Sequence, residues 1–376
     1  MFRKIILFVI KIFSLSLCFK IPGHSRVLLY SQNSKILLKT ISNNTSDLII
    51  DRQKINIFIL FFSIIKFKFT FLEYTRTFIK VVNPKLIITF ADNDLDFYKL
   101  KFFYPNIYFI AVQNGYRFKN RDFFNILESH KNMNKKMLIA DFYFCFNKYY
   151  ANYISKYIKS EYILHGSFRN NLIQIKKPLL NYKNFLFISQ FTTRSEIQKK
   201  TFFSVEKKIL PIIEDYCRLN KMSFFVLFRN NKSDKNFKNE MRFYKSLLKF
   251  KFTPIINRGN SYKIVDLHDN IITVDSTLGY ECLVRNKKVF FFHDRIITED
   301  KKNFKDAFGW PKPIHCNTGI NLTKINKRQI YNFFNVNLRL DYNEWNSKYK
   351  LSFKDLMSFD YKNRALTELV KQCIKN

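Results

Sequence analysis

The sequence predicts a two-lobed α/β fold, in which mostly parallel sheets are covered by helices and a cleft separates the lobes. Three observations lead to this fold class. Short apolar runs alternate with longer helical patterns, 376 residues are enough for two domains, and a polar stretch over residues 171–183 interrupts the alternation. Because strand–helix alternation produces parallel strands joined by right-handed crossovers, each half is expected to be Rossmann-like.

The predicted strands of the first half are short runs rich in branched and aromatic residues. They cover residues 26–31, 48–51, 85–90, 107–112, 142–146 and 162–165. Helices are expected between them, over residues 55–67, 70–82, 94–103 and 147–159.

The second half is more regular and predicts a second sheet. Its strands are expected at residues 185–189, 224–228, 253–256, 271–274 and 289–292, with helices over 199–220, 237–250, 261–268 and 277–285. The chain therefore divides into four predicted parts: an N-terminal extension (1–24), an N-terminal lobe (25–176), a C-terminal lobe (177–340) and a helical tail (341–376).

The charge of the chain is strongly basic. Lys and Arg number 65 against 29 acidic residues, a formal net charge of +36, which attracts polyanions such as nucleic acid, an anionic bilayer or diphosphate substrates. A composition rich in Lys, Asn and Ile and poor in Gly is also what an AT-rich genome imposes, and this bias accounts for part of the excess. Since no long run of like charge and no recognisable nucleic-acid module is present, nucleic acid is the less favoured partner.

The cysteines and the first twenty residues indicate the compartment of the protein and its relation to a membrane. The six cysteines are scattered without metal-binding spacing, which predicts reduced thiols in a cytoplasmic protein with no metal and no cofactor. An apolar stretch from Ile5 is interrupted by Lys11 and is too short for a membrane span of about 20 residues. Three interpretations of residues 1–20 stay open: an amphipathic helix on an anionic membrane, a packed extension of the core, or, less favoured, a true signal peptide or membrane span.

Ligands of doubly wound sheets bind beyond the carboxyl ends of the strands, so the residues that follow each predicted strand are the candidates. Asp92 and Asp94 follow the strand at 85–90. They look like the metal-binding pair of some sugar-nucleotide enzymes and are candidate general bases, but a cap of the next helix is the favoured interpretation for Asp94. Asn114, Gly115 and Arg117 follow the strand at 107–112 and offer amide and guanidinium groups, unless they form an ordinary turn.

Two further loops complete this set. Gly166 and Arg169 follow the strand at 162–165, where the arginine suits a phosphate, unless the loop is a surface hinge. In the second half, Arg194, Arg229 and Arg295 follow three of the predicted strands and could hold further phosphate oxygens.

The most informative segment is the turn at residues 274–281. Asp275, Ser276 and Thr277 lead into a predicted helix whose free N–H groups and hydroxyls form an anion site. Gly279 lies in the first turn of that helix, and Glu281 is placed to accept hydrogen bonds from a ribose. A plain helix cap is the alternative. No Walker loop or G-x-G-x-x-G segment is present, which disfavours ATP and NAD enzymes of those types.

Several motifs in series carry a family resemblance. They are residues 84–93, 97–100, 112–117, 166–171, 275–281 and 310–311. In order and spacing, this series resembles bacterial O-antigen and surface-carbohydrate biosynthesis proteins over roughly residues 20–340. The layout is more distantly similar to CDP-glycerol glycerophosphotransferases and to GT-B glycosyltransferases. In the former, a His serves as the base where Asn114 stands here, and an amide cannot take that role.

The resemblance implies a GT-B-like, metal-independent glycosyltransferase that moves a sugar from a nucleotide-activated donor to a lipid-linked or glycan acceptor. The C-terminal lobe would hold the donor and the N-terminal lobe the acceptor, at the inner face of the cytoplasmic membrane. A CDP-alcohol polyol-phosphate transferase, a non-catalytic scaffold and a basic nucleic-acid-binding protein are the alternatives.

Overall fold

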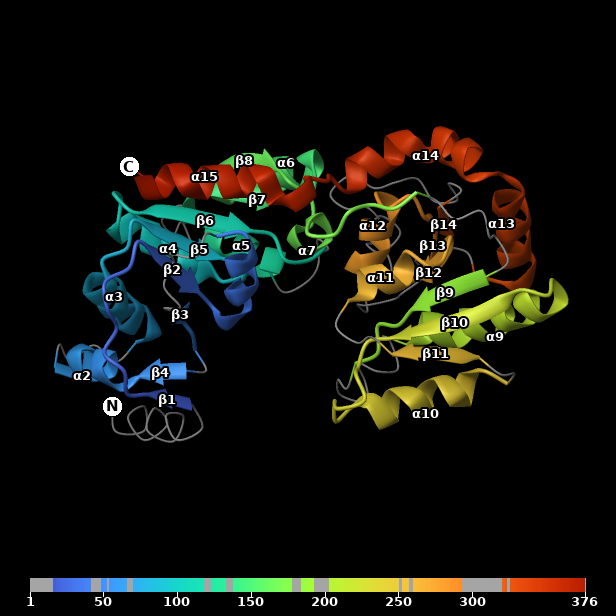
Figure 1. Cartoon of the computed structure of the whole chain (residues 1–376), viewed down its shortest axis with the longest axis horizontal. Coiled ribbons are helices and arrows are strands. Elements are labelled where there is room, and N and C mark those ends of the chain that lie inside the picture. Colours follow the sequence, from blue (N-terminus) through green and yellow to red (C-terminus); the bar gives the residue numbers. More distant parts are fainter. Residues whose placement is uncertain are drawn as a thin grey trace.

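The computed structural model consists of two lobes, each built around a six-stranded parallel sheet (Figure 1). The structure describes residues 16–41, 49–52, 54–65, 70–117, 123–132, 138–177, 184–192, 203–249, 252–256, 260–292, 320–322 and 325–375. The predicted amphipathic helix lies mostly in residues 1–15, outside the described residues. None of the helices in the described ranges combines the length and the apolar character needed to cross a bilayer.

The sheet of the first lobe has the order β3-β2-β5-β6-β7-β8, with all neighbours parallel. Its strands are β2 (Val27–Tyr30), β3 (Ile49–Ile50), β5 (Leu86–Thr89), β6 (Tyr108–Val112), β7 (Leu138–Cys145) and β8 (Ile158–Leu164). All six were predicted, but β7 begins four residues earlier than expected. Asp141 interrupts the apolar run there, and its carboxylate is paired with Lys101 (2.9 Å) and the backbone N–H of Phe109 (2.7 Å).

Helices cover both faces of this sheet. They are η1 (Gln32–Lys39), α2 (Ile57–Ile65), α3 (Phe71–Val82), α4 (Leu95–Phe103), α5 (Phe123–Asn132), α6 (Lys148–Ile154) and α7 (Phe168–Asn171). A separate two-stranded sheet joins β1 (Ser16–Cys18) to β4 (Lys54–Asn56). α3 begins where Thr70 accepts the N–H of Glu73 (3.2 Å) and ends at Asn83 in the left-handed conformation, which gives it well-defined limits.

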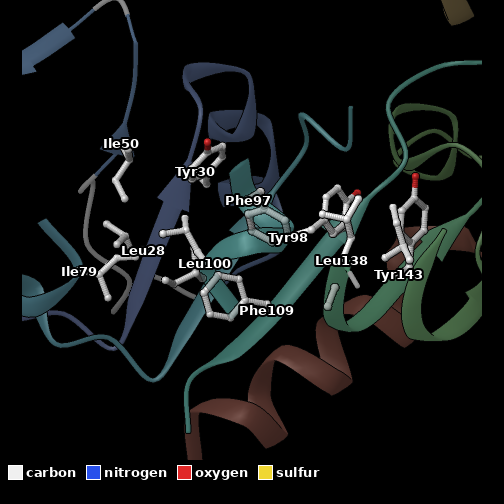
Figure 2. Close-up of a cluster of buried hydrophobic side chains, with 14 of the residues drawn as sticks. Leu28, Tyr30, Ile50, Ile79, Phe97, Tyr98, Leu100, Phe109, Leu138 and Tyr143 are labelled. Carbon is white, nitrogen blue, oxygen red and sulfur yellow. The ribbon is translucent and has the colours of Figure 1, made fainter. Parts of the chain in front are cut away.

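Alternating residues of the central strands divide between two cores. Leu28 and Tyr30 face a cluster with Phe97 and Phe109, shown in Figure 2, whereas Val27 lies in the cluster on the opposite face. This division follows from the two-residue period of a strand.

The second lobe repeats the plan, with the strand order β11-β10-β9-β12-β13-β14. Its strands are β9 (Asn184–Ile188), β10 (Ser223–Phe228), β11 (Thr253–Ile256), β12 (Asn270–Thr273), β13 (Lys288–Phe292) and the unpredicted β14 (Asn321–Leu322). Its helices are α9 (Ser204–Leu219), α10 (Phe237–Leu247), α11 (Ser261–Val265), α12 (Thr277–Leu283) and α13 (Lys327–Arg339). The sheet order places β9 and β12 at the centre, so the loops that follow them lie side by side.

The C-terminal segment forms the helices α14 (Tyr342–Leu356) and α15 (Arg364–Lys375), and it connects the lobes. α14 packs against the second lobe through Trp345, whereas α15 returns to cover the first sheet (Figure 1). Between them, after the end of α14, Phe359 pairs with Gly166 at the lobe junction. Gly166 has φ +76°, and a Cβ there would lie 1.9 Å from the carbonyl oxygen of Ser358. The division into four parts stays a prediction, and the structure adds that the tail serves both lobes.

Candidate functional site

The loops that follow β6 and β12 meet across the lobe junction. The backbone N–H of Tyr116 donates to Oγ1 of Thr277 (3.1 Å), and the ring of Tyr116 stacks on Tyr280 with centroids 3.9 Å apart. These contacts bring the two predicted candidate loops, one from each lobe, into direct contact.

Beside this contact lies a cavity of about 630 Å³, which we name the interlobe cavity. The first lobe lines it with Ile36, Lys39, Asn114, Arg169, Leu172 and Ile173, and the second with Asn260, Ser261, Tyr262, Thr277, Leu278 and Glu281. Its volume is in the range of small-molecule sites. Four of the predicted residues are therefore brought together: Asn114, Arg169, Thr277 and Glu281.

Glu281 is a buried carboxylate that joins the lobes. Its Oε1 accepts a hydrogen bond from the Ser167 hydroxyl of the first lobe, and its Oε2 accepts one from the Tyr262 hydroxyl (3.0 Å). Burial raises the pKa of Glu281 to about 7, although these hydrogen bonds and the positive charges of Arg169 and Arg285 act in the opposite direction. The cavity thus contains a carboxyl group that titrates near neutral pH.

The cavity also contains cations. Arg169, on α7, is exposed and its guanidinium lies over the ring of Phe90, 5.5 Å from the centroid. Lys39, at the end of η1, is exposed in the same lining. Two exposed positive side chains beside a buried carboxyl suit a ligand that carries both phosphate and hydroxyl groups.

Asn114 is held in place by a buried ion pair. Arg117 donates to Oδ1 of Asn114 (2.8 Å) and forms a two-pronged pair with Asp92. The Asp92 carboxylate also accepts from the backbone N–H of Asn114 (3.2 Å) and the Tyr143 hydroxyl (2.7 Å). A carboxylate has about four acceptor positions, so these four hydrogen bonds occupy Asp92 fully. The catalytic role predicted for Asp92 stays a prediction, and the structure gives it a positioning role.

Asp94 caps α4, which was its alternative interpretation. Its Oδ1 accepts the backbone N–H of Asp96 (3.0 Å), and its carboxylate also contacts the Tyr30 hydroxyl (3.1 Å) and Arg52 (3.4 Å). Neither Asp92 nor Asp94 belongs to the lining of the interlobe cavity.

The turn at 274–281 holds the second lobe together as well as lining the cavity. Asp275 exchanges two hydrogen bonds with Gln190 (2.6 and 3.1 Å), which joins the loops after β9 and β12. Ser276 occupies the N-cap position of α12 without a side-chain cap hydrogen bond. A Cβ on Gly279 would lie 2.5 Å from Cγ2 of Thr273, so this glycine allows α12 to pack closely on the sheet.

Arg229, the one predicted arginine of the second lobe that the described residues include, does not line the cavity. Arg229 donates to the carbonyl oxygen of Phe191 (3.3 Å), and its backbone N–H donates to Glu240 (2.9 Å). Arg194, Arg295 and the segment 310–311 lie outside the described residues. Gly115 lies at the contact itself, where a Cβ would come within 3.8 Å of Oγ1 of Thr277.

Two important residues were not predicted. Tyr262 follows Asn260, which caps α11, and the cap motif was the one signal available in the sequence. Arg285 is fully buried, pairs with Asp266 (2.6 and 2.9 Å) and reaches Asn170 of the first lobe (2.9 Å). These partners are 19 and 115 residues away, so no local pattern identifies Arg285 as a junction residue.

A comparison with protein families identifies the family of this chain. A family model described as "putative O-antigen biosynthesis protein" matches residues 110–374. The chain belongs to this family. The predicted family resemblance is thereby confirmed, over a range that includes Asn114, Arg169 and Glu281. No curated protein matches the chain.

Solved structures show that the fold is shared with GT-B proteins. The H444N variant of the wall teichoic acid polymerase TagF superposes with a TM-score of 0.51 at 13% identity, covering 95% of this chain and 90% of TagF. The H548A variant gives 0.52 at 12% identity, covering 94% and 90%. S. aureus MnaA with UDP gives 0.51 at 13% identity, covering 93% and 97%. The predicted α/β fold with mostly parallel sheets is confirmed.

Proposed function

We propose that this protein is a glycosyltransferase of surface-polysaccharide assembly, which moves a sugar from a nucleotide-activated donor to a glycan acceptor. The observation that carries the proposal is the interlobe cavity, which both lobes line with polar and charged side chains. Membership of the O-antigen family supplies the pathway. A UDP complex of MnaA, which has the same fold, supports a nucleotide-linked ligand.

The donor is proposed to bind against the second lobe. Thr277 and Tyr262 offer hydroxyl groups, and the carboxylate of Glu281 retains acceptor positions for ribose hydroxyls beside its two hydrogen bonds. Arg169 and Lys39 approach from the first lobe and can neutralise a diphosphate. A donor held by both lobes stabilises their closed arrangement, which excludes water from the reacting bond.

The acceptor is proposed to bind beside Asn114. Arg117 and Asp92 fix the orientation of this amide, so it can hydrogen-bond a sugar hydroxyl without reorganisation. In the proposed step, the acceptor oxygen forms the new C–O bond as the C–O bond to the diphosphate breaks. Because an amide does not accept a proton, the hydroxyl proton is proposed to pass to the leaving diphosphate, whose charge Arg169 and Lys39 stabilise. No step of this scheme requires a metal.

We further propose that the acceptor is lipid-linked and that the protein works at the cytoplasmic face of the inner membrane. The formal net charge of +36 supports this location, because the cytoplasmic leaflet is anionic.

Donor binding tests the proposal. Titration calorimetry with UDP-, GDP-, dTDP- and CMP-sugars and with CDP-glycerol should identify one nucleotide sugar that binds the wild type. Arg169→Gln removes a cavity cation and should weaken that binding at least about tenfold, since a charge-assisted hydrogen bond is lost. Arg328→Gln, at an exposed position of α13, is the matched control and should bind like the wild type.

Binding of CDP-glycerol alone would favour the polyol-phosphate transferase. No binding of any donor, or equal affinity of the Arg169 and Arg328 variants, would contradict the proposal.

A further inference from the structure

A second cavity lies in the first lobe, where β1 and β4 meet η1. We name it the basal cavity; its volume is about 830 Å³. Three lysines line it, namely Lys20, Lys35 and Lys54, together with His24 and a single carboxylate, Asp51. The three lysines are exposed, and with one carboxylate against them the cavity has an excess of positive charge suited to an anionic group.

A ridge of exposed apolar side chains borders this cavity. Phe19, Ile21, Phe61 and Ile65 are 68%, 63%, 61% and 56% exposed. We name these four residues the apolar ridge. Ile21 also lines the basal cavity, so the ridge and the cavity adjoin. Single exposed apolar residues are ordinary, but several large ones on elements that contact one another mark a binding surface: β1 pairs with β4, and β4 contacts α2.

The helix that carries half of the ridge has the composition of a buried helix. α2 contains nine residues, eight of them Ile, Leu or Phe and none charged, yet only Ile59 and Ser63 are buried. α2, β1 and β4 lie together at the edge of the first lobe remote from the second lobe (Figure 1). The second lobe therefore does not cover this surface.

A buried asparagine, Asn56, helps to fix the ridge to the lobe. Asn56 donates to the carbonyl oxygen of Lys20 (2.7 Å) and accepts the N–H of Ile59 (3.2 Å). The backbone N–H of Asn56 donates to the hydroxyl of Tyr74 (2.9 Å), and Tyr74 also lines the basal cavity. These bonds hold β1, α2 and α3 in a defined arrangement, so the juxtaposition of ridge and cavity is built into the fold.

We propose that the basal cavity binds the phosphate group of a bilayer lipid while the apolar ridge enters the membrane. Lysines next to an anionic leaflet are attracted to its phosphates, and aromatic and branched side chains partition into the interface. The ridge decides between a lipid and a soluble phosphate, because a soluble ligand would leave Phe61 and Ile65 in water.

One short helix separates the two cavities. Gln32, Lys35 and Leu38 of η1 line the basal cavity. Ile36 and Lys39 of the same helix line the interlobe cavity. An eight-residue 3₁₀ helix is only about 16 Å long, so a lipid phosphate in the basal cavity holds a glycan linked to it close to the donor. This last step rests on the proposed function, whereas the lipid contact does not.

Vesicle co-sedimentation of the full chain tests the role proposed for the lysines of the basal cavity. The vesicles contain phosphatidylcholine with about one-third phosphatidylglycerol. The double variant Lys35→Glu, Lys54→Glu should bind at least about tenfold more weakly than the wild type. The control Lys159→Glu, Lys371→Glu changes the net charge equally at exposed positions on β8 and α15, and should lose less than about threefold.

The role proposed for the apolar ridge is tested with a second pair of double variants. Phe61→Ser, Ile65→Ser should reduce binding to vesicles at least about tenfold, whereas Leu219→Ser, Leu267→Ser, at similarly exposed positions of the second lobe, should not. The Phe61/Ile65 and Leu219/Leu267 double variants should both keep the unfolding midpoint and the oligomeric state of the wild type, because the replaced side chains are exposed.

Four outcomes would overturn the inference. Equal vesicle binding by both lysine doubles would show attraction by net charge alone. A lower unfolding midpoint of the ridge double with unchanged vesicle binding would show that another part of the chain covers the ridge. A change from dimer to monomer with unchanged vesicle binding would make a second copy the occupant. Calorimetric binding of glycerol 3-phosphate that the lysine double abolishes, with unchanged vesicle binding, would indicate a soluble phosphate.

Donor calorimetry on the lysine double separates this inference from the proposed function. Normal donor affinity with lost vesicle binding supports both. Loss of vesicle binding by a protein whose wild type binds no donor supports the lipid site alone.

Discussion

Two buried carboxylates near the lobe junction differ in what surrounds them. Asp92 accepts four hydrogen bonds, two of them from the guanidinium of Arg117. Glu281 accepts its two from the neutral hydroxyls of Ser167 and Tyr262, and it lines the interlobe cavity. Both follow strands of parallel sheets. The difference shows that position at a sheet edge does not by itself make a carboxylate reactive; the charge and number of its partners decide.

Removing the cation from Asp92 should have the largest effect. Arg117→Met leaves a fully buried carboxylate without its partner and should lower the free energy of unfolding by about 3–5 kcal/mol, measured in urea. Arg52→Met, which breaks an exposed pair with Asp94 and Asp96, is the control and should cost less than about 1 kcal/mol. Similar losses of unfolding free energy in both variants would mean that the buried pair of Arg117 and Asp92 stabilises the fold no more than an exposed pair does.

The titration of Glu281 should be the next largest effect. Its pKa is raised to about 7 in the folded protein, so the protonated form is favoured by folding. The contribution of Glu281 to the free energy of unfolding is therefore fully present below about pH 4.5. It is lost as pH rises from about 4.5 to about 7, and the total loss is about 3 kcal/mol. Glu281→Gln should remove this slope, measured as unfolding free energy at several pH values.

Glu368→Gln, at an exposed position on α15, should keep the slope of the wild type. A wild type whose stability is flat over this pH range would show that Glu281 is charged throughout and that its cavity is wetter than the structure indicates.

Loss of the Asp94 cap should be the smallest of the three effects. Asp94→Ala removes the acceptor of the Asp96 N–H and should cost about 1 kcal/mol of stability, whereas Asp94→Asn should restore most of it. Donor affinity should be unchanged in both, because Asp94 lies outside the cavity lining. A loss of donor affinity or of transferase activity in Asp94→Asn would instead support the catalytic role predicted from the sequence.

Local patterns predicted the strands well and the site in part. Apolar runs of four to five residues marked β5, β6, β9 and β12 within one or two residues of their ends. The strand β7 was predicted too short, because a charged residue inside a strand ends an apolar pattern when its partner is unknown. α5 was missed because its ten residues bury only a few apolar side chains and show too little of the helical period.

The sequence by itself determined the α/β class, the positions of the strands and the loops at their carboxyl ends, because two-residue and 3.6-residue periods are local properties of the chain. Only the tertiary structure decided which of those loops share a cavity, which carboxylate is saturated by an arginine and which side chains fasten the lobes together. Those outcomes depend on contacts such as Ser167 with Glu281 and Asn170 with Arg285, between residues more than a hundred positions apart. No local period encodes them, because the partners are brought together by the packing of whole sheets.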